Sequence, residues 1–176
     1  MTDLEQSRAR WYITVLVALA ELGHLTWEHL HGGVVSHHLL NRADLPAISN
    51  AWGAVFLPAL AWFLCGSVLK RATTPRAANG IAASFFGSLL VGVTLSAAFV
   101  NGFADASSYI FLGILLSGLL LPVYRGEYVL GFVLGMSFTF GAMLPTVAAA
   151  FVVVVSAIAH YFVRPAFRWL LAKARA

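Results

Sequence analysis

Long apolar stretches separated by short polar connections make up most of the chain. A helix that crosses a bilayer needs about 20 mostly apolar residues, within a range of about 17–25. The pattern predicts six such spans, at residues 11–30, 51–69, 81–100, 107–123, 128–144 and 146–163. Residues 128–163 form one apolar stretch that is too long for a single crossing. We expect Pro145 to break it, because proline lacks the N–H that an interior helix position donates. A single long kinked helix, giving five spans, is the alternative.

The composition places the chain in a membrane. Hydrophobic residues make up 60% of the sequence and charged residues only 10%, whereas soluble domains carry about 25% charged residues. The sequence therefore predicts an all-α integral membrane protein, with residues 1–176 as a single polytopic domain and no separate soluble module. The chain has one cysteine, Cys65, which excludes an intrachain disulfide and a metal framework built on cysteines.

Charges in the connections predict how the spans are oriented. With six spans, one side of the membrane receives Arg8, Arg10, Lys70, Arg71, Arg76, Arg125, Arg164, Arg168, Lys173 and Arg175. The opposite side has only Arg42, together with Asp44 and Asp105. Because basic residues favour the cytoplasmic side, both termini are predicted to be cytoplasmic, in a bacterial plasma (inner) membrane. The net charge of +4 thus points to the lipid bilayer as partner and gives no sign of nucleic-acid binding.

Two further features concern packing and anchoring. Residues 164–176, "RPAFRWLLAKARA", alternate basic with apolar side chains, which predicts a short amphipathic helix at the cytoplasmic surface of the membrane. Small residues recur along the third and fifth spans, at Gly87, Ser88, Gly92, Ser96, Gly131 and Gly135. Such residues let helices approach closely, either within the chain or between the protomers of a homo-oligomer.

Titratable side chains are concentrated in "ELGHLTWEHLHGGVVSHH", residues 21–38, which holds five of the six histidines. Since each helical residue turns by about 100°, the side chains of Glu21, His24, Glu28 and His31 lie on one narrow stripe, as a tandem Glu-x-x-His. On the predicted topology the stripe runs from the middle of the membrane, at Glu21, to its extracytoplasmic edge.

The connection at residues 31–50 is predicted to cap this stripe. Gly32 and Gly33 allow the helix to end, and the chain then returns His37 and His38 to the same mouth. We therefore expect an extracytoplasmic, histidine-rich capping loop. The candidate proton or substrate pathway comprises Glu21, His24, Glu28, His31, Asn50 and Asp105. The candidate metal ligands are His24, Glu28, His31, His37 and His38.

A charge in the middle of a membrane helix costs at least about 2.5–3.5 kcal/mol, and such residues usually face a protein interior or a water-filled cavity and serve a function. The alternative is a Glu21–His24 pair that only fixes span one to its neighbours.

Histidine titrates near neutral pH. The first hypothesis is therefore a small transporter or channel that handles protons or a divalent metal. Below Glu21 the first span offers only Thr14 as a polar group, which argues against a wide aqueous pore.

Other functions stay open. Glu-x-x-His also occurs in dinuclear carboxylate bundles, but here both copies share one helix and no further glutamate lies within a predicted span. A mononuclear zinc or iron enzyme acting on a lipid or a small apolar substrate is the second hypothesis. Haem binding is less favoured, because His160, expected to be a packing residue, lies at the opposite end of the membrane. An accessory subunit of a membrane complex is the last alternative.

Overall fold

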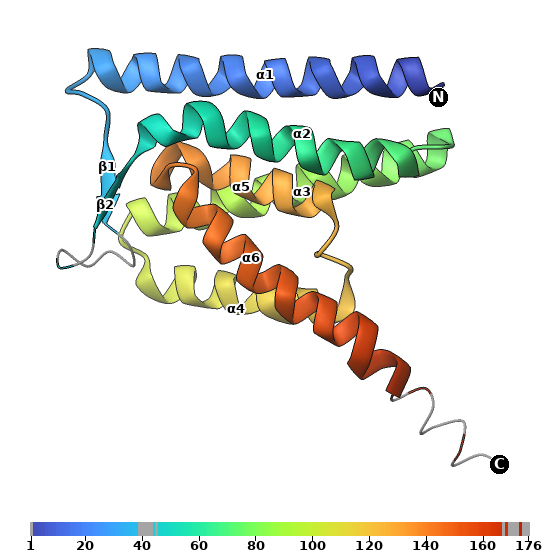
Figure 1. Cartoon of the computed structure of the whole chain (residues 1–176). Coiled ribbons are helices and arrows are strands. Elements are labelled where there is room, and N and C mark those ends of the chain that lie inside the picture. Colours follow the sequence, from blue (N-terminus) through green and yellow to red (C-terminus); the bar gives the residue numbers. More distant parts are fainter. Residues whose placement is uncertain (1, 39–43, 45, 167, 169–172, 174–176) are drawn as a thin grey trace.

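The protein folds as a bundle of helices with a short strand pair at one end (Figure 1). The computed structural model describes residues 2–38, 44, 46–166, 168 and 173. The α-helices in these residues are α1 (Asp3–Leu30), α2 (Gly53–Arg71), α3 (Pro75–Val100), α4 (Ala104–Leu120), α5 (Gly126–Phe140) and α6 (Met143–Ile158). The remaining elements are the strands β1 (Ser36–His38) and β2 (Ala47–Ser49), the 3-10 helix η2 (Asn50–Trp52) and the π-helix η3 (Ala159–Val163).

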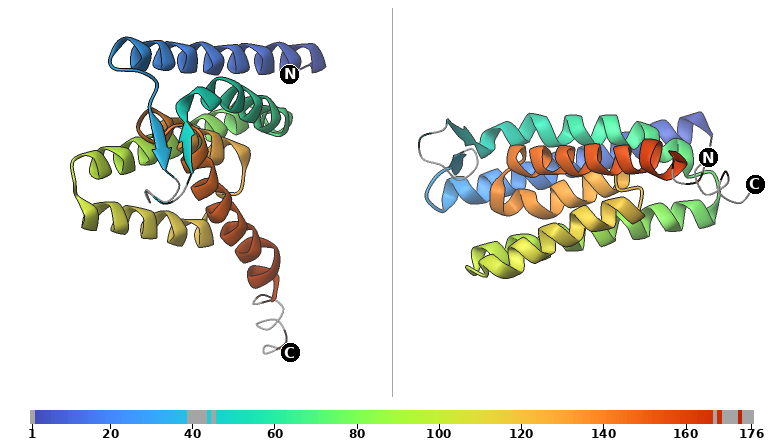
Figure 2. Two further views of the ribbon diagram at one scale, coloured as in Figure 1. Left: turned by 60° about the vertical axis from the view of Figure 1, so that its left-hand side comes forward. Right: turned by 90° about the horizontal axis from the view of Figure 1, so that it is seen from below.

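Successive helices run in alternating directions, so that α1 begins and α6 ends at the same end of the bundle (Figure 1). The strand pair and the α5–α6 connection lie at the other end. Helix α1 is an outer element that packs mainly on α2, whereas α3 and α5 form the closest pair in the molecule. Figure 2 shows the arrangement from two other directions, with β1 and β2 at one end of the helices.

The surface and the helix lengths are compatible with a membrane protein. Among the residues that the structure describes, three helical segments are long and apolar enough to cross a membrane, namely Asn50–Arg71, Pro75–Val100 and Met143–Ala166, and α4 and α5 are shorter apolar helices. Large apolar side chains are widely exposed on them; Phe63, for example, is 74% exposed. Such a surface suits lipid rather than water.

Small residues let α3 and α5 pack with their backbones in contact. A Cβ atom added at Gly92 would lie 2.6 Å from the backbone oxygen of Phe132, and one added at Gly131 or Gly135 would meet the backbone of α3. The structure thus uses these predicted small residues within the chain. Gly87 has open space around it, and a homo-oligomer formed through such faces stays a prediction.

The boundary between the last two predicted spans lies before Pro145 and not at it. Helix α5 ends at Phe140, Gly141 has a φ of 67°, and α6 starts at Met143. Pro145 therefore occupies the first turn of α6, where a missing N–H breaks no intrahelical hydrogen bond. Glycine makes the break because it adopts a positive φ without strain. The predicted helical tail at 164–176 falls mostly outside the described residues.

Candidate functional site

Three titratable side chains of α1 lie in one line on its buried face. The carboxyl groups of Glu21 and Glu28 are each only 5% exposed. Between them stands the His24 ring, with Nδ1 3.7 Å from Glu21 Oε2 and Nε2 3.4 Å from Glu28 Oε1. The i, i+3 and i, i+4 spacings place all three on one helix face, as the periodicity predicts. We call these three residues the α1 relay.

Residues that flank the strand pair close over the Glu28 end of the α1 relay. The Val35 N–H donates to Glu28 Oε2 at 3.1 Å, and Asn50 Nδ2 donates to Glu28 Oε1 at 2.6 Å. The Asn50 N–H in turn donates to the Val35 carbonyl at 2.9 Å. Both Glu28 oxygens therefore have a donor, which is the condition under which a buried carboxylate is tolerated. Asn50, a predicted pathway residue, is the residue that anchors the cap.

Local sequence explains how the chain returns to this position. Gly32 and Gly33 have φ values of 124° and 104°, and the Gly33 N–H donates to the Glu28 carbonyl at 3.0 Å. The strands then pair antiparallel, with Ser36 opposite Ser49 and His37 opposite Ile48. The loop was predicted to cap the stripe, whereas its strand pairing was not predicted.

Two glycines outside the predicted site make room for it. A Cβ atom at Gly53 would collide with the Glu21 carboxyl group, and one at Gly141 would collide with the Asn50 amide. Glu21 therefore packs tightly against the start of α2, and Asn50 packs tightly against the α5–α6 connection. In the sequence, these two positions appear only as glycines next to the start of a predicted helix. That pattern is too common to identify a functional site.

The surroundings of His24 restrict its chemistry. A neutral imidazole has one N–H donor and one acceptor nitrogen, yet both His24 nitrogens face carboxyl groups. Stable arrangements are an imidazolium between two carboxylates, or a neutral ring with a proton on one of the glutamates. Each of these arrangements places one proton among Glu21, His24 and Glu28. The Phe138 ring, 4.7 Å from the imidazole between centroids, covers one face.

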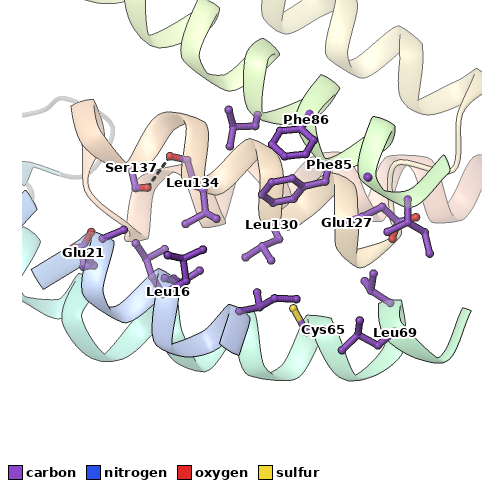
Figure 3. Close-up of a pocket in the computed structure, with 18 of the residues that line it drawn as sticks. Leu16, Glu21, Cys65, Leu69, Phe85, Phe86, Glu127, Leu130, Leu134 and Ser137 are labelled. Atoms are coloured by element: carbon purple, nitrogen blue, oxygen red, sulfur yellow. Dashed lines mark hydrogen bonds between the residues drawn. The ribbon is translucent and has the colours of Figure 1, made fainter. Parts of the chain in front are cut away.

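A cavity of about 670 Å³ adjoins the Glu21 end of the α1 relay (Figure 3). Its walls come from α1, α2, α3 and α5 and are mostly apolar, with Phe85, Leu130 and Cys65 among them. Glu21 and His24 lie at one end of this central cavity, and Glu127 lies at the other.

The Glu127 end was missed by the sequence analysis. Glu127, in the first turn of α5, is 4% exposed, and both its carboxylate oxygens accept hydrogen bonds from Arg71 at the end of α2. Such a two-point pair neutralises the buried charge and fixes its geometry. Glu127 directly precedes the predicted fifth span and was therefore taken as part of a connection. Its pairing with Arg71 depends on how α2 and α5 pack, which spacing along the chain does not reveal.

The other predicted residues lie around the α1 relay or away from it. His31 is exposed, stacks on Trp27 and bonds the Trp27 carbonyl through Nδ1 at 2.8 Å. His38 is exposed on β1, and Asp105 is exposed in the first turn of α4. His37 is half-buried near Glu28; burial lowers its pKa below the ordinary 6.5, and the Glu28 carboxylate opposes part of that shift.

The expected metal site is not assembled in the part of the chain that the structure describes. No group of three or more histidine, cysteine, aspartate or glutamate side chains there is arranged to hold a metal ion. Zinc or iron binding stays a prediction. His160 packs at the far end of α6, with Nδ1 2.9 Å from the Ser156 carbonyl and its ring against Tyr124. Haem binding, the less favoured alternative, stays untested.

Comparison with protein-family models, curated proteins and solved structures gives no match for the chain. Its function therefore has to be argued from the α1 relay and the central cavity.

Proposed function

We propose that the protein is a small membrane transporter in which the α1 relay passes protons between the outer surface and the central cavity. The observation that carries this proposal is a single cavity with a buried carboxyl group at each end, Glu21 beside His24 and Glu127 beside Arg71. Ionisable groups placed at both ends of one membrane cavity are typical of ion and proton pathways.

The orientation follows from the charges. Arg71 and Arg125 belong to the end of the bundle at which α1 begins, and the strand pair belongs to the opposite end. If all six helices cross the bilayer, the positive-inside rule puts the Arg71 end in the cytoplasm. The α1 relay then leads inward from Asn50 and Glu28 at the outer surface to Glu21. Glu127 marks the cytoplasmic end of the same cavity.

The geometry of His24 favours proton transfer over catalysis by a serine or cysteine. A histidine that activates a nucleophile needs one ring nitrogen directed at it, and both His24 nitrogens face carboxyl groups, at 3.7 Å and 3.4 Å. The apolar walls between Glu21 and Glu127 do not support a continuous file of water. They favour a carrier, in which helix movements expose the two ends in turn, over an open channel.

Proton uptake into liposomes tests the proposal. An inside-negative potential is imposed on vesicles that contain the purified protein, and an internal dye reports pH. The wild-type protein is expected to admit protons faster than protein-free vesicles, and Glu21→Gln is expected to abolish the difference. Glu5→Gln is the matched control, because Glu5 is exposed in the first turn of α1. Wild-type uptake equal to that of empty vesicles, or full activity of Glu21→Gln, would refute the proposal.

A further inference from the structure

We propose that the central cavity binds a cationic amphiphile, with an ammonium head at Glu21 and an apolar chain extending toward Glu127. The claim that this amphiphile is transported rests on the proposed function. The claim that it binds rests only on the shape and the charge of the cavity.

The length of the cavity matches one leaflet of a bilayer. Along α1 its wall extends from Ile13 to His24, which corresponds to about 16 Å at a rise of 1.5 Å per residue. The hydrocarbon core of a bilayer is about 30 Å thick, so the cavity is about as long as the apolar part of one leaflet. Its apolar walls include Leu16, Val17 and Leu134, which suit a single hydrocarbon chain.

The charge of the cavity selects the head group. In the α1 relay two carboxyl groups share the His24 imidazole, so one negative charge remains when both glutamates are ionised, even if His24 is protonated. Val35 and Asn50 donate hydrogen bonds to Glu28, whereas Glu21 lines the cavity. At the opposite end Glu127 is balanced by Arg71. Uncompensated negative charge is therefore confined to the Glu21 end. A buried carboxylate there needs either a proton or a cation.

Arg10 is the cation of α1 nearest to this part of the bundle, and it is committed elsewhere. Its Nε donates to the Trp62 carbonyl at 2.7 Å, and its guanidinium carbon lies 3.8 Å from the centroid of the Trp62 ring. Neither Arg10 nor Trp62 lines the cavity. An ammonium ion at Glu21 would thus meet no competing cation from Arg10.

Aromatic rings supply a second attraction for a cation. Phe138 lines the cavity at the Glu21 end, beside His24, and Phe85 and Phe86 line its α3 wall. The face of an aromatic ring attracts an ammonium group, most strongly where water is excluded. An ammonium head placed at Glu21 would replace the proton held there, so that binding of one cation releases up to one proton. This exchange couples the amphiphile to the α1 relay.

Equilibrium dialysis of radiolabelled dodecyltrimethylammonium against the full chain in lipid nanodiscs tests the inference. Empty nanodiscs give the lipid background, and 1-dodecanol and dodecanoate serve as neutral and anionic competitors with the same chain length. We expect saturable binding of one equivalent, with proton release that a pH indicator detects. Glu21→Gln should weaken binding about tenfold or more, equivalent to about 1.4 kcal/mol. Glu5→Gln should bind as the wild type does.

A second variant tests the cavity without altering any charge. Ala82 lines it, and Ala82→Phe should fill the space and weaken binding while the α1 relay stays intact. Absence of saturable binding, equal competition by 1-dodecanol, or unchanged affinity in Glu21→Gln would each overturn the inference. Binding without proton uptake in the liposome assay would support this binding site and refute proton transport. Proton uptake without binding would support proton transport and refute this binding site.

Discussion

At the residue scale, the main feature is that buried charges are placed together instead of being avoided. Removing a single carboxylate from water costs several kcal/mol unless partners compensate for the loss. Glu28 has two donors and a histidine, and Glu127 has the two-point contact with Arg71. Among the described residues, the polar partner of the Glu21 carboxylate is His24 alone, whose Nδ1 lies 3.7 Å from Glu21 Oε2. Of the two glutamates that line the cavity, Glu21 is therefore less compensated than Glu127.

His37 gives a pH-dependent prediction. Burial lowers its pKa in the folded protein below the unfolded value of 6.5, despite the Glu28 carboxylate. The unfolded chain thus takes up a proton more readily than the folded one, so the free energy of unfolding falls as the pH drops from above 6.5 through the lower folded pKa. Thermal unfolding in detergent should show this loss of stability in the wild type and less of it in His37→Gln. Above about pH 7.5 the free energy of unfolding should depend on pH equally in both proteins. A difference between the two that does not change with pH would contradict the prediction.

At the element scale, apolar stretches predicted the helices well because each is long and all but the first are free of charged side chains. The strand pair was harder to predict from the sequence. Three-residue strands are defined by their partner, and the pairing of Ser36 with Ser49 lies next to the Asn50–Glu28 hydrogen bond. Periodicity along α1 could place Glu21, His24 and Glu28 on one face, but it could not identify Asn50 as the group that closes over them. Glu127 and Arg71 are distant in sequence and meet only through α2–α5 packing.

Packing of α3 against α5 provides a matched pair of glycine substitutions. Gly135→Ala places a Cβ atom against the backbone of Leu89 and Val93. Because two backbones have to separate, the free energy of unfolding should fall by about 1–3 kcal/mol. Gly87→Ala, in the same α3 helix but with open space around it, should be neutral or slightly stabilising, since alanine favours helix. Thermal unfolding of both variants in detergent makes the comparison, and equal effects would show that the close contact is unimportant.

At the scale of the whole molecule, the proposals share one requirement, which is that the two ends of the central cavity face opposite sides of the membrane. Helices of alternating direction place the strand pair at one end and Arg71 with Glu127 at the other (Figure 1). The segments that meet the length and hydropathy of a span are Asn50–Arg71, Pro75–Val100 and Met143–Ala166. Helix α1 is long enough to cross a membrane, but it carries the titratable side chains of the α1 relay. Its crossing therefore depends on burying Glu21 and Glu28 against its neighbours.

Cysteine labelling in intact cells tests that requirement directly. In a Cys65→Ser background, Ser36→Cys marks β1, and Thr73→Cys marks the α2–α3 connection; both positions are exposed. Thr73 precedes Thr74, whose hydroxyl caps α3, so the cap is left intact. A maleimide that does not cross membranes should label Ser36→Cys in intact cells and Thr73→Cys only after permeabilisation. Labelling of both from outside would show that α2 does not cross the membrane. The reverse pattern would turn the molecule over, placing the α1 relay at the cytoplasmic surface and making Glu127 the outer carboxylate.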